Sequence, residues 1–287
     1  MEYRIGLVGS DNSHAITFSQ IANGIDQINH VPGFKATHIF GLDDDRTKEV
    51  AEKGKIARIV SDPNQMIGEI DIAFIEFRHG GLHLEYARPF IESGIPVFVD
   101  KPLASTVDEA RRMVKMAVDM GIPFTSFSTL RFTDAVQELR SIFSREEPIF
   151  MSASGPADVK SEYGGLVFYG IHLSEILNEV AGCGSIEVVA RAKEWDIAAT
   201  VMHEHLLADL KMAPIMPYIF AIQGLTKQSY FFKKVDMEGC YKKGMLKIKE
   251  MLDKRQWPLS GEAMIEPVRV VKAIEDCVLS NTLSRKL

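Results

Sequence analysis

The sequence predicts an α/β protein with a doubly wound parallel sheet in its first half and an α+β domain in its second. Up to about residue 125, short apolar strands alternate with amphipathic helices, a rhythm typical of βαβ units. After Arg131 the strand-like runs become longer and alternate apolar with polar residues, which favours a largely antiparallel sheet with one open face. We therefore expect one domain over residues 1–127 and a second over residues 128–287.

The elements of the first half follow from apolar runs and helical periodicity. The helix expected over 107–120, for example, places Ala110, Met113, Val114 and Ala117 on one face, the spacing of a buried stripe. Strands are expected over 3–8, 35–42, 57–60, 71–77, 96–99 and 123–127, and the other helices over 13–29, 47–53 and 83–93. In the second half we expect helices over 171–181 and 262–279 and strands over 185–191, 218–223 and 228–233.

Composition excludes several classes of protein. The net charge of −6 argues against a nucleic-acid partner, because such proteins carry a basic surface. No apolar run approaches the ~20 residues that a membrane span requires. The sequence enters a strand-like run at once, which leaves no room for a signal peptide, so we expect a cytoplasmic protein. The cysteines Cys183, Cys240 and Cys277 form no CxxC pair, and no metal site is predicted.

The first strand runs into a loop that partly matches a dinucleotide-binding turn. Residues 9–14 read Gly-Ser-Asp-Asn-Ser-His, whereas the GxGxxG fingerprint has glycines at its first, third and sixth positions. Gly9 fits the turn, but Asp11 places a negative charge where a pyrophosphate should pass. A dinucleotide site and a plain strand-to-helix turn are both open on this loop alone. The candidate cofactor contacts here are Gly9, Ser10, Asn12 and Ser13.

The end of the second strand carries acidic residues that suit a nucleotide ribose. An acidic side chain there can bind the ribose 2′-hydroxyl, and Asp43 and Asp44 are the candidates. This favours NAD, although Arg46 leaves NADP open. The alternative is that these residues only cap the helix expected from Thr47.

Four later segments, in order along the chain, resemble a known family. Residues 97–102 read Val-Phe-Val-Asp-Lys-Pro, and residues 126–132 lead a sixth strand into an Arg-Phe pair. Residues 164–175 run from two glycines to a histidine and a glutamate three positions later, and a strand-turn-strand segment covers 218–232. Together they resemble the glucose-fructose oxidoreductase, inositol dehydrogenase and rhizopine-catabolism (Gfo/Idh/MocA) family, in a less characterised branch. The resemblance implies a Rossmann domain followed by a substrate-binding and oligomerisation domain.

Lys101, His172 and Glu175 are the catalytic candidates that the resemblance implies. Lys101 follows a buried strand at the carboxyl edge of the sheet, where open α/β sheets bind ligands, and its ammonium can polarise a substrate hydroxyl. A surface lysine paired with Asp100 is the alternative. His172 would serve as general base, oriented by Glu175 on the same helix face; the alternative is a histidine that caps its own helix.

The remaining candidates contact cofactor or substrate. Asp100 and His83, the latter in a loop that the resemblance places beside the nicotinamide, are candidate cofactor contacts, although His83 equally suits helix capping. Arg131 and Tyr169 are candidate substrate contacts, and a salt bridge between the domains is the alternative for Arg131. The family commonly has an aspartate where this chain has Phe168.

The resemblance implies an NAD(P)-dependent dehydrogenase. It would transfer hydride between a nicotinamide and a secondary alcohol of a sugar, cyclitol or related polyol. The open face of the second sheet predicts a homodimer or homotetramer. Because Asp11 and Phe168 depart from the pattern, the alternative is a nucleotide-binding sensor or regulatory protein that keeps the fold without turnover.

Overall fold

The computed structural model describes residues 2–214 and 218–287, which form two compact units. Unit 1 comprises Met1–Ala104, Asp108–Phe127 and Gly239–Ser260. Unit 2 comprises Ser105–Val107, Ser128–Glu238 and Gly261–Leu287. Gly239–Ser260, which the sequence places in a second domain over 128–287, clusters with unit 1.

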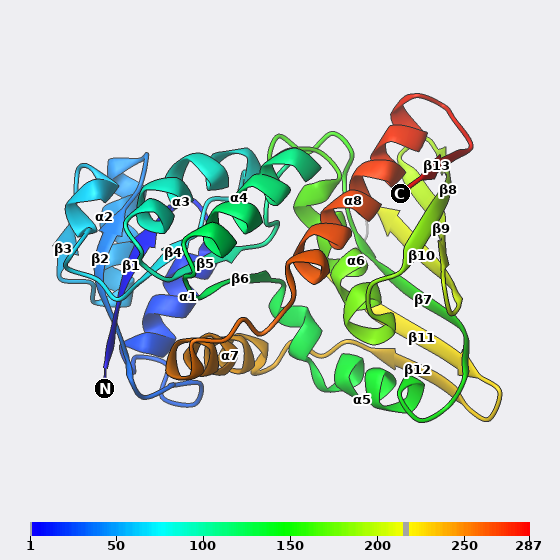
Figure 1. Ribbon diagram of the computed structural model, residues 1–287, viewed down its shortest axis with the longest axis horizontal. Helices are drawn as coiled ribbons and strands as arrows, with labels where there is room; N and C mark the ends of the chain where they lie inside the picture. Colours follow the sequence, from blue (N-terminus) through cyan, green and yellow to red (C-terminus); the bar gives the residue numbers. More distant parts are fainter. Residues whose placement is uncertain (1, 215–217) are drawn as a thin grey trace. The chain divides into compact units, whose positions relative to one another are not determined.

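Unit 1 is built on a six-stranded parallel sheet of order β3-β2-β1-β4-β5-β6 (Figure 1). Its strands are β1 (Tyr3–Val8), β2 (Phe34–Phe40), β3 (Arg58–Ile59), β4 (Ile72–Ile75), β5 (Val97–Asp100) and β6 (Phe124–Phe127). Its helices are α1 (Ser13–Ala22), α2 (Asp44–Gly54), α3 (His83–Glu92), α4 (Val107–Asp119) and α7 (Cys240–Lys254), with short 3-10 helices η1 (Pro63–Met66) and η2 (Gly80–Leu82). The predicted doubly wound parallel sheet is confirmed.

Aromatic packing holds the centre of unit 1. Every residue of β4, β5 and β6 is buried, as expected for strands covered by helices on both faces; α3 and α4 cover one face and α1 and α7 the other (Figure 1). The rings of Phe18, Phe74 and Phe98 pack edge to face, with centroids 5.0–5.7 Å apart. Such contacts add to the stability gained from apolar burial.

The first helix ends earlier than predicted. The expected helix over 13–29 stops at Ala22, and the backbone N–H of the C-cap residue Asn23 bonds to the Ser19 carbonyl. Gly24 then adopts a left-handed conformation with φ +67°, which glycine permits without the strain a side chain would bring.

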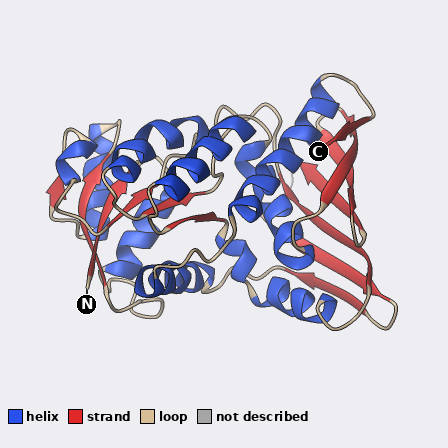
Figure 2. Ribbon diagram, in the orientation of Figure 1, coloured by secondary structure: helices blue, strands red, loops and turns tan. Residues whose placement is uncertain are grey.

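Unit 2 is a seven-stranded sheet of order β12-β11-β7-β10-β9-β8-β13 with helices on one face (Figure 2). All its strand pairs are antiparallel except β10 with β7, so the predicted largely antiparallel sheet is confirmed. The strands are β7 (Pro148–Pro156), β8 (Ser185–Lys193), β9 (Asp196–His203), β10 (Leu207–Ala213), β11 (Ala221–Thr226), β12 (Tyr230–Lys234) and β13 (Ser284–Lys286). The helices are η3 (Thr129–Phe132), α5 (Asp134–Phe143), α6 (Val167–Ala181) and α8 (Gly261–Leu279). Among the helices described in either unit, none has the length and apolarity needed to cross a membrane.

An apolar row crosses the sheet face of unit 2 that the helices leave uncovered. The strand registers place Tyr230 opposite Leu225, Leu225 opposite Phe150, Phe150 opposite Leu207, and Leu207 opposite Met202. Four of the five are exposed and Phe150 is half-buried. We call these five side chains the open-face row. It spans five neighbouring strands, so its members form one continuous patch and not scattered surface residues.

Candidate functional site

Polar side chains gather where β1, β4 and β5 end in unit 1. Ser10 and Asn12 follow β1, Glu76 follows β4 directly, and Asp100 closes β5 before Lys101. The three strands are parallel neighbours, so their carboxyl ends meet at one edge, the usual ligand-binding edge of such sheets. All five side chains are buried.

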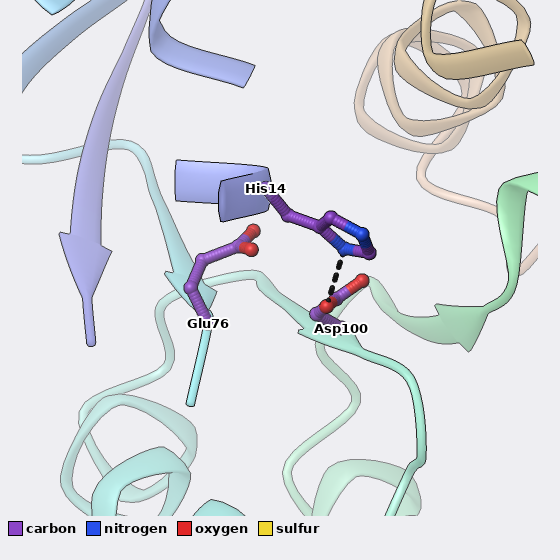
Figure 3. Close-up of side chains that lie close together, drawn as sticks. All are labelled: His14, Glu76 and Asp100. Carbon is purple, nitrogen blue, oxygen red and sulfur yellow. Dashed lines mark hydrogen bonds and ion pairs between the residues drawn. The ribbon is translucent and has the colours of Figure 1, made fainter. Parts of the chain in front are cut away.

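Asp100 is the centre of this group. Its Oδ2 accepts a hydrogen bond from Asn12 Nδ2 at 2.9 Å and lies 2.8 Å from Nδ1 of the His14 ring (Figure 3). Burial acts to raise the pKa of Asp100, but attraction to His14 and Lys101 outweighs it, so the pKa is lowered. The carboxylate is therefore ionised and held in place by its neighbours. This arrangement favours a positioning role for Asp100 over the predicted direct contact with cofactor.

Glu76 is a buried carboxyl group in the same cluster. Glu76 is 0% exposed. Burial, together with repulsion from Asp100, raises the pKa of the Glu76 carboxyl group well above the usual range. Neither of its oxygens has a hydrogen-bond partner among the described residues. An acidic group in such surroundings is a candidate functional residue.

Lys101 is only 3% exposed, so it is not the surface lysine of the alternative interpretation. The peptide bond to Pro102 is cis. The ammonium group of Lys101 attracts the carboxyl groups of both Glu76 and Asp100. A positive charge is thus fixed beside two carboxyl groups at the ligand-binding edge of the sheet.

The loop after β1 has the backbone shape that a phosphate-binding turn needs. Gly9 has φ +114°, and a Cβ there would lie 2.8 Å from the backbone nitrogen of Phe77, so only glycine fits. The Asp11 carboxylate accepts hydrogen bonds from the backbone N–H of Arg78 at 3.2 and 3.3 Å. Its oxygens are therefore already engaged with the next loop. This turn fits a dinucleotide through Gly9 and the first turn of α1.

Two residues predicted to contact the cofactor, Ser10 and Asn12, have side chains that are hydrogen-bonded to other residues of unit 1. Asn12 caps α1 by accepting from the His14 backbone N–H, in addition to holding Asp100. Ser10 Oγ lies 2.9 Å from Thr47 Oγ1. Both are buried, so any contact they make with a cofactor is through the main chain. Ser13 is the first residue of α1 and is exposed.

After β2, Asp43 caps helix α2, as in the alternative to ribose binding. Its carboxylate accepts from the Arg46 backbone N–H at 2.8 Å and caps α2. Asp44 lies exposed in the first turn of that helix. The Arg46 guanidinium donates to the Ser10 carbonyl at 3.0 Å and pairs with Glu49. This joins α2 to the turn after β1.

His83 is fully buried at the start of α3. Its ring nitrogens lie 2.8 Å from the carbonyl oxygens of Phe77 and Pro102, and burial lowers the pKa of this histidine. The ring thus joins the end of β4 to the loop after β5. These contacts favour a structural role over the predicted contact with cofactor.

In unit 2, α6 positions His172. The ring is buried; its Nδ1 lies 2.7 Å from Ser128 Oγ, and its centroid lies 5.4 Å from the Phe220 ring and 5.9 Å from the Tyr169 ring. His172 is the sixth residue of α6, which begins at Val167, so it does not cap its own helix.

Arg131 and Glu175 form a buried ion pair. Arg131 is 1% exposed, and its Nε lies 2.6 Å from Glu175 Oε2. The guanidinium also donates to Asn178 Oδ1 at 3.1 Å and pairs with Glu179 at 3.3 Å. These partners all lie in unit 2. An ion-pair role within one unit is therefore favoured over the predicted substrate contact and over the salt bridge between domains.

A cavity of about 560 Å³ opens in unit 2 beside the His172 helix. It combines aromatic rings with charged and hydroxyl groups, as small polar ligands require. The Tyr169 ring contacts both His172 and Tyr218. The lining residues are Pro156, Ala157, Asp158, Lys160, Ser161, Glu162, Tyr163, Phe168, Tyr169, Pro214 and Tyr218.

Two residues of these clusters, Glu76 and Ser128, are not predicted from the sequence. Glu76 comes directly after the wholly apolar strand β4, and a charged residue at that place was the available signal. Ser128, which contacts His172, also donates its backbone N–H to Glu175 Oε2 at 2.6 Å. Its link to α6 is a contact across 44 residues that no local pattern reveals.

Comparison with known proteins relates the first part of the chain to a family. Residues 4–126 match the Gfo/Idh/MocA sequence profile, described as an oxidoreductase family with an NAD-binding Rossmann fold. Residues 4–126 are therefore similar to the NAD-binding Rossmann domain of the Gfo/Idh/MocA family. The matched residues include the turn at Gly9, Glu76 and Lys101.

Curated relatives match part of the chain. Inositol 2-dehydrogenase of Acidothermus cellulolyticus is 31% identical over 135 residues, which span 46% of this chain and 37% of that protein. Inositol 2-dehydrogenase of Paracoccus denitrificans is 40% identical over 60 residues, 21% of this chain and 18% of that protein. The chain thus spans well under half the length of these relatives.

Solved structures match the fold of the whole chain. Myo-inositol 2-dehydrogenase of Lactobacillus plantarum has a TM-score of 0.86 at 14% identity, and the match covers 100% of this chain and 100% of that one. Myo-inositol dehydrogenase of Lactobacillus casei, solved with NAD(H) and myo-inositol, has a TM-score of 0.85 at 11% identity, covering 100% of this chain and 97% of that one. At such identity the likeness shows the fold alone.

Proposed function

We infer that this protein is an NAD(P)-dependent dehydrogenase acting on a secondary alcohol of a sugar, cyclitol or related polyol. The observation that carries the proposal is the buried Lys101, fixed after β5 at the ligand-binding edge of a family NAD-binding domain. A nicotinamide bound there accepts or supplies the hydride. The residues of the chain itself must then handle the alcohol oxygen and its proton.

Lys101 suits the first of these tasks. An ammonium donates hydrogen bonds and stabilises negative charge that develops on an alcohol oxygen as its proton leaves. Its burial removes competing water, which strengthens this interaction. The cis bond to Pro102 lies on its carboxyl side, and Asp100 is held by Asn12 and His14 on its amino side.

His172 suits the second task. A histidine ring can take up the hydroxyl proton in oxidation and return it in reduction. Ser128 holds Nδ1, and the rings of Tyr169 and Phe220 flank the imidazole. We assign proton transfer to His172 and leave Glu175 a positioning role through its bond to Ser128.

The cofactor would be held by the turn after β1. Gly9 allows the close approach of a pyrophosphate, and the first-turn amides of α1 at Ser13 point where an anion is favoured. Asp44 is the exposed acidic group at the end of β2 that is available to a ribose. We propose NAD as the preferred dinucleotide for this reason.

The cavity lined by Tyr169 supports a polyol substrate. Its tyrosines offer both apolar faces and hydroxyl groups, and Asp158 and Lys160 add charged hydrogen-bond partners. The curated relatives that match the chain are named inositol dehydrogenases. Phe168 lines the cavity where the family commonly has an aspartate, so we expect a substrate with fewer polar contacts at that point.

The test is a paired measurement of binding and turnover. Thermal unfolding with millimolar NAD or NADP should show a higher midpoint, because a ligand of the native state stabilises it. Absorbance at the nicotinamide band should then report turnover with myo-inositol, other cyclitols or sugar acids. Stabilisation without turnover of any of them would favour the sensor alternative.

Variants decide the role of the lysine. Lys101→Ala should lower kcat by about 10²–10³-fold, the usual loss when a charge-stabilising donor is removed. Lys115→Ala is the matched control, because that lysine lies 74% exposed on α4. Turnover by Lys101→Ala at the wild-type rate would overturn the assignment.

A further inference from the structure

His14, Glu76 and Asp100 converge on one point in unit 1 (Figure 3). They come from the start of α1, the end of β4 and the end of β5. One possible ligand atom from each residue can be chosen so that all three lie within 4.8 Å of one another. The proposed dehydrogenase mechanism does not use Glu76, and His14 enters it only by holding Asp100.

Glu76 points into this cluster without a hydrogen-bond partner. Its side chain is 0% exposed, and both carboxyl oxygens are without a partner among residues 2–214 and 218–287. Buried polar groups are nearly always hydrogen-bonded, because leaving one unpaired costs free energy. Figure 3 shows its oxygens directed toward the space beside His14 and Asp100. The geometry indicates that another group binds there.

The cluster has the composition of a metal-binding site. One imidazole and two carboxyl groups form a mixed nitrogen and oxygen donor set that suits borderline divalent cations. Asp100 is also held by Asn12 Nδ2, and such outer contacts commonly orient metal ligands. His14 packs against the Tyr241 ring, with centroids 5.1 Å apart, which fixes the plane of the imidazole.

We propose that His14, Glu76 and Asp100 bind a divalent cation, Zn²⁺ or Mn²⁺. Bonds from these metals to histidine nitrogen and carboxylate oxygen are about 2.0–2.2 Å long, so small side-chain rotations bring the three donors into range. Three protein ligands leave a coordination position for water or another oxygen ligand. The site also explains why residues 11–14 read Asp-Asn-Ser-His in place of the glycine pattern: His14 is a ligand and Asn12 positions Asp100.

Isothermal titration of the full chain, dialysed against a chelator, with ZnCl₂ or MnCl₂ alone tests this site. We expect saturable binding of one equivalent, weakened by about 100-fold or more in Glu76→Gln and His14→Gln. The matched controls are Glu92→Gln and His205→Gln, which change an exposed carboxylate and an exposed histidine. Both should bind like the wild type. No one-equivalent binding to the wild type, or undiminished binding to both site variants, would overturn the proposal.

Thermal unfolding gives a second reading that does not depend on turnover. The cation should raise the midpoint of the wild type but not that of Glu76→Gln. Glu76→Gln keeps the shape of the side chain and removes only the buried acid. This variant therefore tests cation binding even if His14→Gln fails to fold. An equal rise in both proteins would count against the site. Neither measurement includes a dinucleotide or a polyol, so their result is independent of the dehydrogenase assay.

Discussion

The Arg131 guanidinium lies 2.6 Å from the Glu175 carboxylate, and both side chains are buried in unit 2. Glu175 also accepts the backbone N–H of Ser128, whose hydroxyl contacts His172. The ion pair therefore fixes η3 against α6 at the place where the candidate base is held. Arg131, a candidate substrate contact, thus lies in the network that holds Ser128 beside His172.

Arg131→Met should destabilise unit 2 strongly. The substitution leaves Glu175 buried without its cation and Glu179 with only the exposed Arg140. Breaking a buried pair in this way costs about 3–5 kcal/mol. Arg140→Met is the control, because Arg140 pairs with the same Glu179 from a side chain that is 57% exposed. It should cost about 1 kcal/mol or less. Urea unfolding measures both, and equal losses would contradict the buried network.

Ser128→Ala should weaken proton transfer by His172 while leaving the imidazole ring in place. Loss of the hydroxyl 2.7 Å from Nδ1 frees the ring to rotate, so kcat should fall by about tenfold, part of what a general base contributes. KM should change little, and the pH profile of kcat should shift. Ser128→Thr keeps a hydroxyl and should restore most of the rate. A purely structural serine would leave the pH profile where it was.

Sequence periodicity predicts the strands and helices of unit 1 well where burial is uniform. The strands at 3–8, 96–99 and 123–127 lie within a residue of β1, β5 and β6 at both ends. The helix expected over 13–29 is too long because Ile25 and Ile28 continue its apolar spacing. Ile28 is in fact 82% exposed.

Contacts between distant segments cannot be predicted in this way. Helix α7 has an apolar face at Met245, Ile248 and Met251, but periodicity does not reveal that Tyr241 packs on Phe18 of unit 1. The same limit applies to the candidate sites. Lys101 stands out after its strand, whereas the convergence of His14 with Glu76 depends on the order of the strands in the sheet.

Stability should fall below about pH 6.5 through His203. Burial lowers the pKa of this histidine from its ordinary 6.5, so the unfolded chain binds its proton first as the pH falls. The contribution of neutral His203 to the free energy of unfolding is complete above pH 6.5. It decreases as the pH falls from 6.5 to the pKa of His203 in the folded protein. Urea unfolding at pH 7.5 and 5.5 should therefore show a larger loss for wild type than for His203→Gln. His205→Gln, at an exposed position, should lose as much as wild type; equal losses in all three would contradict the assignment.

The open-face row should hold copies of the chain together. Tyr230 and Leu207 are 63% and 51% exposed on neighbouring parts of one sheet face, and an apolar patch of this kind is typical of a subunit interface. We propose a homodimer or homotetramer formed through this row. Leu207→Lys places a charge in its middle and should raise the dissociation constant by more than about tenfold. Leu246→Lys, which changes an equally exposed leucine on α7, should not. Light scattering during size-exclusion chromatography measures both, and a wild-type protein that is monomeric at high micromolar concentration would contradict the proposal.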